Sequence, residues 1–136
     1  MVKKKSSYED LQENVRKMKL PEIEVFTNKY PDRDYEIQLE VPEFTCICPK
    51  TGLPDFGTIL VTYCPDQVCI ELKSFKLYLV AFRNVGIFHE NVVNRVLDDI
   101  VKTCKPRWVR VEGVIMPRGG ITTTVAAEYK AKKKTR

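Results

Sequence analysis

Hydrophobic and polar residues alternate in the segment 35–41, and this period of two predicts a strand with one buried face. The β-branched run 58–63 predicts a second strand, and the segments 108–116 and 121–129 predict two more. The link Pro117-Arg118-Gly119-Gly120 favours a hairpin between the last two, because glycine adopts the backbone angles that tight turns require. The pattern therefore predicts two strands early in the chain and two late.

Helical periodicity fills the interval between these strand pairs. The segment 68–82 begins extended and turns helical, with four apolar residues on one face: Leu72, Phe75, Leu79 and Phe82. The segment 89–104 repeats apolar residues at intervals of three and four: Val92, Val93, Val96, Leu97, Ile100, Val101 and Cys104. A short helix capped by Ser6 or Ser7 is predicted to run to about Met18, followed by an extended arm with a turn over residues 21–34.

The order β-β-α-α-β-β predicts an α+β fold. One antiparallel four-stranded sheet with two helices on one face buries both apolar helix stripes. Neither outer strand is short or blocked by proline, so edge-to-edge assembly into a closed ring would remove the free edges. We expect a basic tail and short helix over residues 1–20, one domain over 21–129 and a second basic tail over 130–136.

The net charge of +5 is located at the chain ends. Eight positive charges and no acid lie in residues 3–5 and 130–136, which leaves −3 for residues 6–129. We interpret the tails as solvated ends rather than as a nucleic-acid surface. Five cysteines, an odd number, and the lack of an apolar N-terminal run indicate free thiols and a cytoplasmic location.

Candidate chemistry centres on the stretch Phe44–Gly57, which contains Cys46, Cys48 and Asp55. Its prolines and glycines fix the path of the chain, and Lys50 lies beside Cys48, where its charge would favour a thiolate. Such a loop suits a nucleophile and its proton partner, although an ordinary tight connection explains the same residues.

Further candidates flank the predicted helices. Lys73 and Lys76 lie on the first turn of a helix, where positive charge is unfavourable unless an anion such as phosphate binds there, and Arg118 lies in a glycine turn that also suits phosphate. His89, the single histidine, begins a helix beside Glu90 and fits a capping, core or catalytic role. Zinc ligation by cysteines and His89 matches no standard finger spacing, so no resident metal is expected. The cysteines in question are Cys46, Cys48, Cys64 and Cys69.

Several of these motifs together closely resemble the short, single-module 7-cyano-7-deazaguanine reductases, NADPH-dependent nitrile reductases of queuosine biosynthesis. The matching runs are Cys48-Pro49-Lys50-Thr51-Gly52-Leu53-Pro54-Asp55-Phe56, Glu71-Leu72-Lys73-Ser74-Phe75-Lys76-Leu77-Tyr78, Phe82-Arg83-Asn84, Phe88-His89-Glu90 and Pro117-Arg118-Gly119-Gly120. The resemblance implies the tunnelling fold of GTP cyclohydrolase I, with sheets joined into a barrel by oligomerisation, active sites between subunits and two stacked pentameric rings. No direct contact with nucleic acid is expected.

The resemblance also implies roles for residues. Cys48 would attack the nitrile carbon to form a covalent thioimide, and Asp55 would protonate the nitrogen with His89 in the catalytic group. The deazaguanine would be held by Glu71, Leu72, His89 and Glu90. The NADPH phosphates would be held by Lys73, Ser74, Lys76, Arg118 and Gly119.

Other readings of the sequence remain open. A related amidinotransferase forms the same thioimide on modified RNA, and a zinc-stabilised RNA-binding module would use the cysteines and the lysine tails. No glycine-rich dinucleotide fingerprint is present, so the cofactor prediction depends on the resemblance and on the cations. Cys46, so close to Cys48, departs from the pattern.

Overall fold

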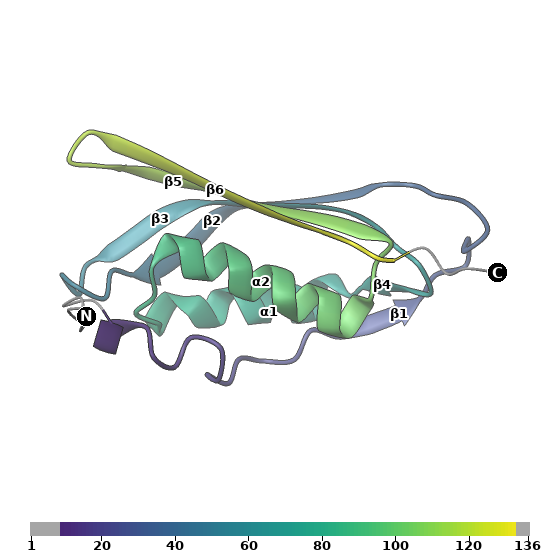
Figure 1. Cartoon of the computed structure of the whole chain (residues 1–136), viewed down its shortest axis with the longest axis horizontal. Helices are drawn as coiled ribbons and strands as arrows, with labels where there is room; N and C mark the ends of the chain where they lie inside the picture. Colours follow the sequence, from purple (N-terminus) through teal and green to yellow (C-terminus); the bar gives the residue numbers. More distant parts are fainter. Residues whose placement is uncertain (1–8, 133–136) are drawn as a thin grey trace, which may run out of the picture.

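The computed structural model describes residues 9–132. Its centre is an antiparallel sheet of four strands in the order β2-β3-β5-β6, with two helices lying side by side on one face (Figure 1). The strands are β2 (Ile37–Ile47), β3 (Pro54–Cys64), β5 (Trp108–Arg118) and β6 (Ile121–Lys130), and the helices are α1 (Leu72–Val80) and α2 (His89–Cys104). The α+β fold and its order of elements are thus confirmed.

The sheet alternates as its sequence predicts. Ile59, Val61 and Tyr63 of β3 are buried and opposed across the β3–β5 register by Gly113, Val111 and Val109. A Cβ on Gly113 would lie 2.8 Å from Val93 Cγ2, so the missing side chain lets α2 approach the sheet closely.

Helix α2 matches its prediction at both ends. Its buried residues are Val92, Val93, Val96, Leu97, Ile100 and Cys104. Lys105 ends the helix in the left-handed region at φ 46°, and Pro106 prevents its continuation. This helix fixes the position of His89, its first residue.

Helix α1 matches its prediction less completely. Phe75 and Leu79 are buried, as is Phe82 in the following 3₁₀ turn η2 (Ala81–Asn84), but Leu72 is 61% exposed. Leu72 nevertheless lines the same cavity between α1 and β2 as Phe75 and Leu79, so it lies on the predicted face without being buried.

The prediction of an N-terminal helix is wrong within the described residues. Only a 3₁₀ turn, η1 (Glu9–Leu11), and irregular turns precede Met18, while the proposed caps Ser6 and Ser7 lie outside the described residues. Arg95 of α2 donates to the carbonyl oxygens of Val15 and Met18 at 2.6 and 2.7 Å. These contacts tie the N-terminal segment to α2.

The arm over residues 21–34 is extended, as expected, and it contributes a strand that the alternation pattern did not reveal. β1 (Val25–Thr27) pairs with β4 (Val68–Ile70) in a separate two-stranded sheet. Each strand has three residues, too few for a period of two to register. None of the helices described within residues 9–132 is both long and apolar enough to cross a membrane.

Candidate active site

The connection between β2 and β3 is a closed turn over residues 48–53. The Cys48 N–H donates to Leu53 O and the Gly52 N–H donates to Cys48 O, both at 2.9 Å. Gly52 lies at φ 71°, where a side chain would be strained. The predicted loop is therefore shorter than the stretch Phe44–Gly57, whose two ends are paired strand, and the position of Cys48 is fixed from both sides.

The turn stabilises a thiolate at Cys48, which is partly exposed. The Thr51 hydroxyl is the main cause that lowers the pKa of Cys48, followed by the backbone N–H groups of Thr51 and Lys50. Burial and the charge of Asp55 oppose this shift. Lys50 thus contributes through its backbone, and Thr51 is a functional residue that the sequence reading missed, although a hydroxyl three residues after a cysteine in a tight turn is a usable signal.

Asp55 and His89 meet beside this turn. His89 Nε2 lies 2.9 Å from Asp55 Oδ2, and the Asp55 side chain is 5% exposed. The end of β2 brings them together, because the Ile47 N–H donates to Val85 O and the Ile47 carbonyl accepts from the Ile87 N–H. The start of α2 is thereby tied to the strand that precedes Cys48.

Arg118 completes the surroundings of Asp55. Its Nε lies 2.9 Å from Asp55 Oδ1, and its Nη2 donates to Pro54 O at 2.7 Å. Oδ1 has this charged neighbour but accepts no well-aligned hydrogen bond within the described residues. Arg118, which was predicted to hold cofactor phosphate, thus contacts Asp55, the predicted proton donor. The two meet because β5 finishes at the end of the sheet where β3 begins.

Glu71, Leu72, Lys73, Ser74 and Lys76 lie at the start of α1. The Glu71 carboxylate caps this helix, accepting from the N–H groups of Lys73 and Ser74 at 2.9 and 2.7 Å, and these bonds lower the pKa of Glu71. The Glu71 carboxylate thus already supplies the negative charge that the two lysines on the first turn of α1, Lys73 and Lys76, were inferred to require. The buried Ser74 hydroxyl donates to Glu71 O and accepts from the Glu24 N–H, bracing the arm against the helix.

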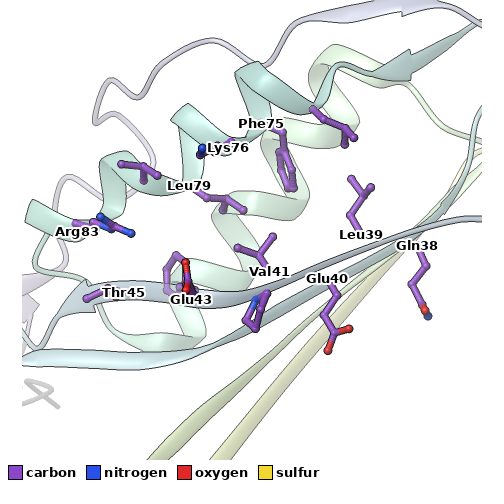
Figure 2. A pocket seen from close by; sticks show the side chains of 14 residues that line it. Gln38, Leu39, Glu40, Val41, Glu43, Thr45, Phe75, Lys76, Leu79 and Arg83 are labelled. Atoms are coloured by element: carbon purple, nitrogen blue, oxygen red, sulfur yellow. The ribbon is translucent and has the colours of Figure 1, made fainter.

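A cavity of about 430 Å³ separates α1 from β2. Figure 2 shows Phe75 and Leu79 of the helix on the side that faces Leu39 and Val41 of the strand. Two cations, Lys76 and Arg83, also line it. They are seven residues apart, a spacing that places both on one helical face and that the sequence reading did not use.

The predicted site residues therefore form two groups. Cys48, Asp55, His89 and Arg118 belong to segments at one end of the sheet, where the β2–β3 turn, the start of α2 and the β5–β6 hairpin all lie (Figure 1). Leu72, Lys73 and Lys76 are exposed on α1, Glu90 is exposed on α2, and Gly119 is exposed in the hairpin turn at φ 58°. Among residues 9–132, the described polar contacts of Asp55 join it to the first group and to no residue of α1.

Comparison with known proteins identifies the family of the chain. The family model of the QueF-like proteins matches residues 54–134. The NADPH-dependent 7-cyano-7-deazaguanine reductase of Chlorobaculum tepidum is 60% identical over 111 residues, which cover 82% of this chain and 95% of that protein. The chain belongs to the QueF-like family. Reductases of the same name from Chloroherpeton thalassium and Elusimicrobium minutum are 56% and 54% identical, covering 85% and 84% of this chain and 100% and 86% of their own lengths.

A solved QueF-like structure supports the fold. The apo form of an archaeosine synthase QueF-Like superposes with a TM-score of 0.66 at 21% identity, covering 72% of this chain and 96% of that one. At this identity the likeness concerns the tunnelling-type fold. The expectation of a QueF-like α+β domain is confirmed by both comparisons.

Proposed function

We propose that this QueF-like protein is an NADPH-dependent 7-cyano-7-deazaguanine reductase, which converts the nitrile to an aminomethyl group in queuosine biosynthesis. The names of its relatives at 54–60% identity support this activity. The observation that carries the mechanism is the thiolate-stabilising turn at Cys48 beside the Asp55–His89 pair. These groups supply a soft nucleophile and a proton at one end of the sheet.

The first chemical step is the addition of Cys48 to the nitrile carbon. A sulfur lone pair forms the C–S bond, the nitrile π pair moves to nitrogen, and nitrogen takes a proton from Asp55, giving a neutral thioimide. One proton lies between His89 Nε2 and Asp55 Oδ2, whichever atom holds it, because the two are 2.9 Å apart. Asp55 is 5% exposed and His89 21% exposed, so protein atoms shield the pair from most of the bulk water.

NADPH, when bound, would supply one hydride to the thioimide carbon and a second to the imine carbon. Between the two, the nitrogen lone pair expels the Cys48 thiolate, which breaks the C–S bond and gives the imine. We assign its phosphates to Lys73, Lys76, Arg118 and the Gly119 backbone, with Ser74 bracing the helix start. The exposed lysines of α1 suit an anionic ligand. The cavity beside them is lined by two cations, Lys76 and Arg83, and by two carboxylates, Glu40 and Glu43, so its lining carries no net positive charge. Arg118 lies at the catalytic group in this single chain, so a site that uses all three cations is expected to involve a second subunit.

The base of the substrate needs acceptors for its N–H groups, and Glu71, Leu72, His89 and Glu90 are assigned to it. Glu90 is exposed beside His89, whereas both carboxylate oxygens of Glu71 already accept backbone hydrogen bonds. An ionised carboxylate has further lone pairs, so the capping role of Glu71 is compatible with base recognition.

The open edges of β2 and β6 support a homo-oligomer, which we propose to be a decamer of two pentameric rings in the cytoplasm. Both strands are long, with 11 and 10 residues, and each has one partner in the sheet. Pairing β6 with β2 of a neighbour would satisfy these edges. Native mass spectrometry tests the assembly, and a fully active monomer would contradict it.

The test of the function is NADPH oxidation with 7-cyano-7-deazaguanine. Reduction of a nitrile to an amine requires two hydrides, so two NADPH should be consumed for each amine formed. Substrate lacking the nitrile is the matched control and should cause no oxidation. Conversion of the nitrile to an amidine without NADPH would instead identify an amidinotransferase.

A further inference from the structure

Three potential metal ligands converge beside the catalytic turn. The Sγ of Cys46, a carboxylate oxygen of Asp55 and a ring nitrogen of His89 lie within 4.8 Å of one another, and they form the one group of this kind found within residues 9–132. Zinc binds such atoms at about 2.0–2.3 Å, which places donors around one ion roughly 3.5 Å apart. Shortening the longest of these separations by at most about 1.3 Å would therefore bring all three donors onto one ion.

Rigid elements hold this set. Cys46 and Asp55 are direct cross-strand neighbours in the β2–β3 register, and His89 is tied to β2 through the contacts of Ile47. The distant cysteines that sequence alone had left as candidate ligands, Cys64 and Cys69, are not members of the group. The structure thus narrows the zinc question to Cys46, the residue that departs from the family pattern.

Asp55 has unused capacity to bind a cation. Its side chain is 5% exposed, yet Oδ1 accepts no well-aligned hydrogen bond within the described residues. A buried carboxylate oxygen whose one charged neighbour is poorly aligned for a hydrogen bond keeps lone pairs that a metal ion would satisfy.

Two features oppose a cation and must be displaced. Arg118 already lies 2.9 Å from Asp55 Oδ1, but its side chain is 43% exposed and can move into solvent. Burial raises the pKa of Cys46 to about 12, so its thiol proton must leave when a metal binds. Coordination to zinc deprotonates a thiol outright, and the proton passes to buffer.

We propose that Cys46, Asp55 and His89 form a site for a thiophilic divalent cation such as Zn²⁺, with the fourth position open. Occupancy removes Asp55 and His89 from proton transfer, so the metal inhibits the enzyme. The inhibition rests on the proposed function, whereas the binding site does not.

Cobalt(II) is the probe for the site, because its bond to a thiolate gives a charge-transfer absorption band. Wild-type protein, purified without metal, should bind one Co²⁺ per chain with this band. Cys46→Ala and His89→Ala should each weaken binding by more than ~100-fold, since even residues that merely orient ligands change metal affinity by ~10- to 100-fold. Testing both variants separates loss of the site from misfolding. His89 is 21% exposed and tolerates truncation more readily than the fully buried Cys46.

Cys48→Ala and Cys104→Ala are the matched cysteine controls and should keep the band. Arg118→Ala should strengthen binding by ~10-fold or more, because it removes a competing positive charge. A band that survives both Cys46→Ala and His89→Ala, or one that Cys48→Ala abolishes, would overturn the site.

Inhibition is measured separately, as the rate of thioimide formation in the presence of Zn²⁺. The rate of each variant is compared with its own rate in metal-free buffer. Wild-type protein should lose adduct formation at about one Zn²⁺ per chain and recover it with chelator, while Cys46→Ala should resist. Equal sensitivity of wild type and Cys46→Ala would contradict the inhibitory role. A cobalt band in a protein without reductase activity would support the site and refute the proposed function.

Discussion

Thr51 controls the nucleophile more directly than Lys50 does. Its hydroxyl is the largest cause that lowers the pKa of Cys48, and its backbone N–H adds to the effect. By contrast, burial raises the pKa of Cys46 to about 12, so this neighbour stays protonated at neutral pH. Two cysteines separated by one residue therefore differ in reactivity because one lies in a donor-rich turn and the other in the core.

Thr51→Val removes the hydroxyl while keeping the shape of the side chain. A lowered thiol pKa means that the thiolate persists to lower pH, so the alkylation rate of Cys48 should fall at a higher pH in the variant than in wild type. The rate of iodoacetamide labelling at Cys48 against pH measures this shift. Thr103→Val, on the remote end of α2, is the control, and identical profiles for Thr51→Val and wild type would contradict the role of the hydroxyl.

Asp55→Asn tests the proton donor. The amide is nearly isosteric, and the half-exposed Arg118 can turn to water, so the fold should persist. Turnover should fall by at least ~100-fold, the usual effect of losing a general acid. Circular dichroism and NADPH oxidation measure the two properties, and joint loss of fold and activity would make the residue structural.

At the scale of elements, the sequence revealed α2 from His89 to Cys104 because its apolar period continues over four turns. The helix predicted to run to Met18 is replaced by turns in the described residues. This segment is held by Arg95 of α2, which bonds Val15 O from 80 residues away, a contact that no local pattern reveals. The contact of Arg118 with Asp55 is likewise set by how far the β5–β6 hairpin extends. Local patterns thus gave the four long strands, the two α-helices and the Cys48 loop, while contacts between elements set the pairing of β1 with β4 and the surroundings of Asp55.

Arg95→Ala should release the N-terminal arm. The side chain is 11% exposed and bonds two backbone carbonyls of the arm, so its loss should cost ~1–3 kcal/mol of stability and expose residues 16–19 to trypsin. Limited proteolysis with thermal unfolding measures both effects. Arg110→Ala, which breaks an exposed pair with Glu128, is the control and should change neither. Cleavage at the wild-type rate in Arg95→Ala would show that other contacts hold the arm.

Lys73→Ala and Lys76→Ala test the start of α1 as the phosphate site. Each should weaken NADPH binding by ~10- to 100-fold, because one charge-assisted contact is worth ~1.5–3 kcal/mol. Thioimide formation needs no cofactor and should continue, while the exposed Lys29→Ala should affect neither. Variants that bind NADPH normally but form no thioimide would show that these lysines bind the substrate base or stabilise the fold instead. Arg118 is unsuited to this comparison because it also contacts Asp55.

At the scale of the whole molecule, the fold brings the turn after β2, the start of α2 and the end of β5 to one end of the sheet. The cations Lys73 and Lys76 lie on α1, which a cavity separates from β2, an edge strand of the sheet. Nucleophile and cofactor residues would therefore meet most simply across a subunit boundary, as the free edges of β2 and β6 allow.

The central claim is that Cys48 becomes covalently bound to the nitrile substrate. Intact-mass spectrometry after mixing the protein with 7-cyano-7-deazaguanine, without NADPH, tests it directly. Wild-type protein should gain the mass of one substrate per chain, Cys46→Ala in metal-free buffer should form the same adduct, and Cys48→Ala should form none. An adduct that survives Cys48→Ala would contradict the account.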